Sequence, residues 1–120
     1  MSAADELRAR VPEVARCYDE TRATVLEAGL VDRELKLLCA RYLAEEIGDF
    51  EPYGDRERAA LEWCEAVAWT AERADDELWA RLHAHFSEPE LVELGYVIAF
   101  TLGQMHFLRT RGIRPDPASL

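Results

Sequence analysis

Residues 87–111 constrain the fold most, because they read as one long helix with apolar side chains on two faces. Ser87 and Glu90 have the spacing of a capping box, Pro89 is tolerated in a first helical turn, and Gly112 is a typical helix stop. One face carries Leu91, Leu94, Ile98, Met105 and Leu108, and the other carries Tyr96, Phe100 and Phe107. A helix that is apolar around much of its circumference has to be covered on both sides.

The cover can come from neighbouring helices of the same chain or from a second copy. We expect a second copy, because a small helical protein has few helices with which to cover two faces. Gly95, Ala99 and Gly103 support this expectation, since small residues at four-residue steps let another helix approach closely.

Four shorter helices are predicted before the long one, at residues 12–28, 32–48, 55–70 and 75–86. Gly29 is the expected stop of the first, Asp32 the N-cap of the second, and Asp75 or Asp76 the N-cap of the fourth. The apolar face of the first helix carries Val11, Val14, Tyr18 and Val25. The chain therefore reads as an all-α bundle of about five helices, in a single domain over residues 1–112 with a tail at 113–120.

Composition excludes several classes of partner. The net charge of −10, with arginines interspersed among acidic residues, argues against nucleic-acid binding, which needs clustered positive charge. No apolar run reaches the ~20 residues of a membrane-spanning helix, and the N-terminus lacks an apolar signal core. We expect a cytoplasmic, bacterial protein with reduced thiols and no membrane partner.

Three segments together resemble the carboxymuconolactone decarboxylase family, which includes the alkylhydroperoxidase D-like proteins. They are YDETRATVLEAGLVDRELKLLCARYL (residues 18–43), ERAALEWCEAVA (57–68) and FSEPELVELGYVIAFTLGQMHFLRTRG (86–112). The resemblance covers residues 12–112 and implies an alkylhydroperoxidase D-like bundle that forms trimers or hexamers. The peroxidase branch of that family carries a C-x-x-C-x-x-x-H run, and this chain has none. A short acidic linker stands where the resemblance would place the redox helix.

The cysteines are Cys17, Cys39 and Cys64, too far apart in sequence to form that motif. A thiol peroxidase needs an accessible, easily deprotonated cysteine and a second thiol to resolve the sulfenic acid. Cys39 and Cys64 lie on the apolar stripes of their helices, where free cysteine commonly packs as a small hydrophobic residue. A contact between Cys39 and Cys64 in the folded chain remains open as an alternative.

Other candidate site residues are few. His106 lies on a strip of the long helix where it is either a histidine satisfied in the core or an interface, or a catalytic base. Glu34 is the nearest match to the acid–base glutamate that the resemblance implies. His83 and His85 are two apart and therefore point to different faces, which is poor spacing for a shared metal. His85 is expected to be half buried and His83 exposed, and no metal or cofactor is expected.

Three functions follow as hypotheses. The first is a divergent member of the family that binds or acts on a small organic molecule, in a pocket lined by aromatic residues and by His106. The second is a thiol-dependent peroxidase that uses Cys39 and Cys64. The third is a non-enzymatic oligomeric assembly or regulatory module built on the two-faced long helix.

Overall fold

The computed structural model describes residues 1–117, and this part of the chain is helical and contains no strand. Its α-helices are α1 (Ala3–Ala9), α2 (Pro12–Thr21), α3 (Arg33–Leu43), α4 (Asp55–Ala68), α5 (Asp76–His85) and α6 (Glu88–Thr110). A π-helical turn (Arg22–Leu26) extends α2, and a 3₁₀ turn (Ala71–Arg73) follows α4. The predicted all-α class is therefore confirmed for the described residues.

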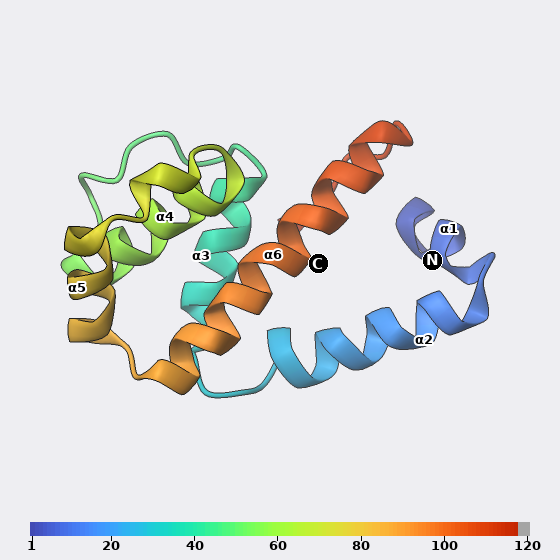
Figure 1. Ribbon diagram of the computed structural model, residues 1–120. Coiled ribbons are helices and arrows are strands. Elements are labelled where there is room, and N and C mark those ends of the chain that lie inside the picture. The colour runs from blue at the N-terminus through green and yellow to red at the C-terminus, as the bar shows by residue number, and fades with distance from the viewer. Residues whose placement is uncertain (118–120) are drawn as a thin grey trace.

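Helix α6 is the centre of the molecule (Figure 1). It crosses the molecule diagonally, with α3, α4 and α5 on one side and the arm formed by α1 and α2 on the other. Its buried face carries Leu91, Leu94, Ile98, Met105 and Leu108, as predicted, and packs into the core with α3 and α4. By length and composition, α6 is the one helix in residues 1–117 that could cross a membrane, a test that the core helix of a soluble protein also passes.

The predicted N-caps are present at three helix starts. The Asp32 side chain accepts a hydrogen bond from the Leu35 N–H at 3.1 Å, and Asp75, rather than Asp76, caps α5. Ser87 and Glu90 form the predicted capping box at the start of α6. These short polar side chains satisfy backbone donors that have no partner within the helix, which fixes where each helix begins.

Two features of the N-terminal half differ from the prediction. Helix α1 was not expected, and a capping box between Ser2 and Asp5 starts it. Val11 and Val14 are 53% and 51% exposed, so they do not form a buried face with Tyr18. The reason is that the arm lies against one side of α6 only, and it does so through Arg8 and Tyr18 rather than through the valines.

The arm is held by a stack of side chains. The Arg8 guanidinium lies 3.5 Å from the centroid of the Tyr18 ring, and Tyr18 stacks on Phe100 of α6 at 5.8 Å. Arg8 is buried and also donates a hydrogen bond to Gln104 Oε1 at 3.0 Å. Phe100, on the second apolar face of α6, is therefore partly covered within the chain.

The junction between α2 and α3 is held by the chain's one lysine. Lys36 is buried, and its Nζ donates to the carbonyl oxygens of Val25 at 2.5 Å and Ala28 at 2.6 Å. It also pairs with Glu93 of α6 at 3.0 Å. The Glu93 carboxylate accepts hydrogen bonds from the N–H groups of Leu30 and Val31. This network fixes the connecting loop against α6.

The C-terminal segment is only partly described. Residues 113–117 follow the end of α6, and Ile113 packs against the core. The rest of the predicted tail, residues 118–120, lies outside the described residues.

Candidate functional site

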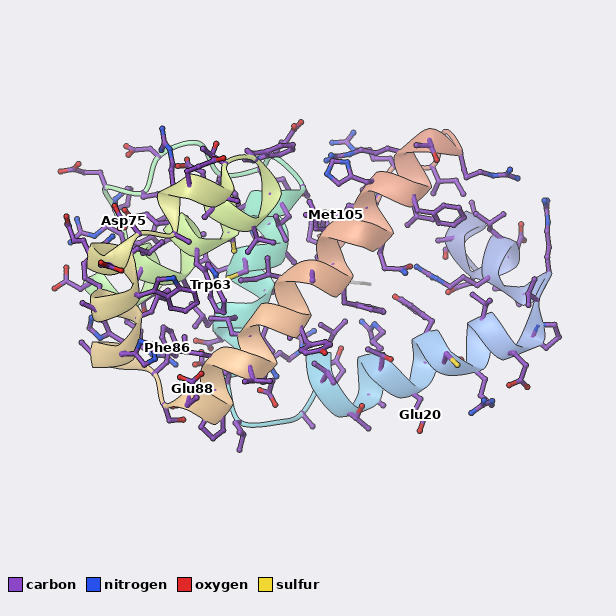
Figure 2. The ribbon with its side chains drawn as sticks, in the orientation of Figure 1. Glu20, Trp63, Asp75, Phe86, Glu88 and Met105 are labelled. Atoms are coloured by element: carbon purple, nitrogen blue, oxygen red, sulfur yellow. The ribbon has the colours of Figure 1, made fainter. Side chains whose placement is uncertain are left out.

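An apolar groove with a volume of about 350 Å³ lies where α4, α5 and α6 meet. We call it the aromatic groove, and its lining residues are Trp63, Trp79, Glu88, Leu91, Val92, Gly95, Tyr96 and Ala99. Figure 2 labels two of them, Trp63 on α4 and Glu88 at the start of α6. Small-molecule sites in proteins are concave, mostly apolar and carry few polar groups, and the aromatic groove has these properties.

The inner wall of the groove depends on a glycine. A Cβ atom at Gly95 would lie 3.1 Å from the Trp63 ring, so only glycine lets the indole rest against α6 without a shift. Trp79 packs edge-on against Trp63, with ring centroids 5.4 Å apart and an interplanar angle of 65°. This T-shaped arrangement is a preferred geometry for aromatic pairs. The two indoles therefore form a fixed wall rather than two independent side chains.

A charged pair lies at the rim of the groove, where α5 turns into α6. His83 Nε2 is 2.8 Å from Glu88 Oε2, and His83 Nδ1 is 2.9 Å from the carbonyl oxygen of Trp79. The His83 ring also lies 6.0 Å from the Trp79 ring, measured between centroids. Because a carbonyl and a carboxylate can only accept, hydrogen bonds to both of them need a proton on each ring nitrogen, which is the imidazolium form of His83.

The environment of His83 agrees with a protonated ring. The hydrogen bond to the Trp79 carbonyl, and then the one to Glu88, raise the pKa of His83 above its ordinary value. Both side chains are more than half exposed, so the pair can exchange protons and exchange partners with solvent. The sequence predicted an exposed position for His83, as observed, but indicated no role for it.

Cys39 of α3 and Cys64 of α4 lie in contact, although 24 residues separate them in the sequence. Both thiols are free and both side chains are fully buried. Burial, and then the hydrogen bond with Cys39, raise the pKa of Cys64 well above its ordinary value. The two thiols therefore interact directly, but the environment disfavours the thiolate that reacts with peroxide.

The remaining sequence candidates lie apart from both places. Glu34 is exposed on α3, whereas the thiols of Cys39 and Cys64 are buried, so Glu34 is not positioned as their base. His106 is exposed on α6, lies 5.8 Å from the Trp69 ring and does not line the aromatic groove. His85 is exposed rather than half buried, because α5 ends at this residue. Cys17 is exposed on α2.

The groove was only partly foreseeable. The hypothesis of a pocket lined by aromatic residues came from the sequence, but the pairing of His83 with Glu88 depends on the angle between α5 and α6. That angle is set by Phe86, whose extended backbone separates the two helices. No sequence spacing reports such an angle, so the pair could not be predicted.

Among residues 1–117, no group of three or more His, Cys, Asp or Glu side chains could hold a metal ion. The wider comparisons give no relative from which a role could be carried over. No protein-family model, no curated protein and no solved structure matches this chain.

Proposed function

We propose that this protein binds a small organic molecule in the aromatic groove, as a divergent relative of the carboxymuconolactone decarboxylase family without a dithiol peroxidase site. The observation that carries the proposal is the groove itself, walled by Trp63, Trp79 and Tyr96. Its volume of about 350 Å³ is at the lower end of ligand sites, which favours a compact ligand.

The charges around the groove favour a neutral or cationic ligand over an anionic one. Glu88 is the charged residue in the groove wall, and the chain has a net charge of −10. Aromatic faces attract cations and stack on neutral rings. His83 is the candidate proton donor to a bound ligand, because it stands beside Trp79 and its two hydrogen bonds raise its pKa.

Binding of 2-naphthol, a neutral two-ring probe, tests the proposal by titration calorimetry. We expect Trp79→Leu to weaken binding about tenfold, since loss of an aromatic contact of ~1.4 kcal/mol corresponds to that factor. The matched control is Trp69→Leu, which removes a 52% exposed tryptophan that does not line the groove. We also expect the anion 2-naphthoate to bind more weakly than 2-naphthol.

Two results would contradict the proposal. One is a loss of the heat of binding in Trp69→Leu while Trp79→Leu still binds the probe. The other is no binding of either probe to a protein whose circular dichroism shows the helical fold.

The finer fold and the assembly remain part of this proposal. The order of the helices and the segments quoted above support an alkylhydroperoxidase D-like bundle, and the resemblance implies a trimer or hexamer. Tyr96 and Phe107, on the second apolar face of α6, are 71% and 51% exposed, which supports self-association.

A second candidate function is thiol-dependent peroxide reduction. The contact between Cys39 and Cys64 favours it, because oxidation of one thiol would place the sulfenic acid beside its resolving partner. Peptide mapping after exposure to hydrogen peroxide tests it. A Cys39–Cys64 disulfide formed faster than free cysteine is oxidised would support peroxidase activity, whereas slower oxidation would leave the pair as packing residues.

A further inference from the structure

Helix α6 carries an exposed stripe along most of its length. The residues of this α6 stripe are Val92, Tyr96, Ala99, Gly103, His106 and Phe107, all of them exposed. Steps of three and four positions place them on one side of the helix, and from Val92 to Phe107 the stripe is ~22 Å long. Tyr96 is 71% exposed, Val92 54% and Phe107 51%.

The α6 stripe contains no charged side chain. Glu93 is the one Asp, Glu, Lys or Arg between Val92 and Leu108, and it points to Lys36 on another side of the helix. An exposed helix face in a monomer is normally polar. The whole chain has 38 charged residues, 14 basic and 24 acidic, so their absence from this face indicates a covered surface rather than a solvated one.

The stripe has small residues at its centre and large ones at its ends. Ala99 and Gly103 lie in the middle, and a Cβ atom at Gly103 would meet nothing within 4 Å. Tyr96 lies on one side of this centre and Phe107 on the other. When two such helices cross antiparallel about a two-fold axis at the centre, small residues face small residues and Tyr96 of one copy faces Phe107 of the other.

The charges at the two ends of α6 select the same arrangement. Glu88 and Glu90 lie in the first turn of α6, Arg109 lies in its last turn, and Arg111 is its C-cap residue. Antiparallel pairing places the acidic end of one copy beside the basic end of the other, and it also opposes the two helix dipoles. Parallel pairing would place like charges together. A surface that complements itself under a two-fold rotation is typical of a dimer interface.

The dimensions of the molecule agree with an uncovered interface. Its radius of gyration is 14.6 Å, against roughly 13.6 Å for a compact domain of this length. Its accessible surface is 7016 Å², against roughly 6,600 Å² for a monomer of this mass.

We infer that the α6 stripe is a two-fold interface with a second copy of this chain, with the two α6 helices antiparallel. This goes beyond the binding of a ligand and stands without it. One consequence does rest on the proposed function: Phe107 of the second copy would lie over Tyr96 and close the open side of the aromatic groove. The pairing is compatible with a dimer or a hexamer, but not with an isolated trimer.

Sedimentation velocity tests the interface with the full chain. We expect the wild type to have a mass of 27.4 kDa, twice the 13.7 kDa of one chain, or a whole-number multiple of that dimer mass. Gly103→Glu should break the two-fold contact and so reduce the measured mass. The helix itself should not be weakened, because glutamate has a higher helix propensity than glycine. The matched control Val14→Glu, at an exposed valine of α2, should leave the mass unchanged.

Disulfide trapping tests the antiparallel orientation, in a Cys17→Ser background that removes the exposed thiol. Under an air-oxidised glutathione buffer, a mixture of Ala99→Cys and Gly103→Cys chains should form a covalent dimer, and either variant alone should not. Covalent dimers of each variant alone would indicate parallel pairing and overturn the inference.

Three other results would also overturn it. They are a wild-type monomer, a trimer, and a monomer that floats with vesicles of phosphatidylcholine and phosphatidylglycerol, which would make the stripe a membrane-facing surface. Because sedimentation needs no ligand, failure of the interface is distinguishable from failure of the aromatic groove.

Discussion

At the scale of single residues, the two buried cysteines are the feature with the clearest chemical consequence. Sequence spacing excluded a C-x-x-C motif and predicted apolar positions for Cys39 and Cys64, and both are fully buried. Their contact across α3 and α4 was left open, because sequence periodicity places a residue on a face but does not say which residue faces it.

We predict that one of the three thiols reacts with dithionitrobenzoate in the native protein, and that this thiol is Cys17. Cys39 and Cys64 should react only as the chain unfolds, since both are buried and the pKa of Cys64 is raised. The check is the absorbance released before and after addition of guanidinium chloride. Two or more fast-reacting thiols in the native state would show that the pair is accessible.

The Lys36–Glu93 pair predicts a specific pH dependence. Burial alone would raise the pKa of Glu93, but hydrogen bonds from Val31 and Leu30 and the Lys36 ammonium outweigh burial and lower it below 4.5. A carboxyl with a depressed folded-state pKa stabilises the fold above its unfolded pKa, and this contribution is lost as the pH falls through the folded-state value.

We therefore expect the unfolding free energy of Glu93→Gln to fall less steeply than that of the wild type as the pH is lowered below about 4.5. At neutral pH the same variant should be about 3 kcal/mol less stable, because Lys36 stays buried without its partner. Urea unfolding at a series of pH values measures both effects. Glu6→Gln, at an exposed glutamate of α1, is the control; identical pH profiles for the two variants would contradict the prediction.

Gly29 is required by the same network. Its φ of +103° is strained for other residues, and a Cβ atom there would lie 2.2 Å from Glu93 Oε1. We expect Gly29→Ala to cost about 2–3 kcal/mol of unfolding free energy, through backbone strain and displacement of the carboxylate. Gly48→Ala is the control, since nothing lies within 4 Å of a Cβ at Gly48. Equal thermal midpoints for the two variants would show that the loop adapts.

At the scale of helices, the ends of α3 and α6 show what a sequence can and cannot report. Both helices end in a Schellman motif, with Glu46 N–H bonded to the Arg41 carbonyl in one and Ile113 N–H bonded to the Leu108 carbonyl in the other. Gly112 occupies the left-handed position of α6 and was predicted as a stop. The same position after α3 holds Glu45, which carries no such signal.

The prediction of a helix up to residue 48 was therefore wrong, because α3 ends at Leu43. Starts of helices were predicted better, since Asp32, Asp75 and Ser87 act through their own side chains. Helix α1 was missed although Ser2 and Asp5 form a capping box, because Asp replaces the usual Glu or Gln at the third position.

Glu45→Gly should stabilise the protein by about 1 kcal/mol, because glycine adopts the observed φ of +65° without steric cost. The neighbouring substitution Glu46→Gly should lower stability. The backbone of Glu46 is not left-handed, so glycine relieves no strain there and only increases the conformational entropy of the unfolded chain. Thermal unfolding of both variants measures the difference. A lower midpoint for Glu45→Gly than for the wild type would contradict this account of the α3 terminus.

At the scale of the whole molecule, α6 connects the core, the α1–α2 arm and the α6 stripe. One side of it packs into the core with α3 and α4, another holds the α1–α2 arm through Phe100 and Gln104, and the α6 stripe faces solvent. The sequence predicted a two-faced helix, and the core face was correct residue by residue. The sequence did not predict how much of the second face the arm covers. That cover comes from long-range contacts of Arg8 and Tyr18, and such contacts leave no periodic pattern in the sequence.

The central claim is that the aromatic groove holds a small ligand, and the indole N–H resonances of the three tryptophans test it most directly. In a two-dimensional nitrogen–proton spectrum, we expect 2-naphthol to shift the resonances of Trp63 and Trp79, which line the groove, and to leave that of Trp69 unchanged. Saturable shifts confined to Trp63 and Trp79 would establish the groove as a binding site. A shift of Trp69 alone, or no saturable shift at Trp63 and Trp79, would contradict the claim.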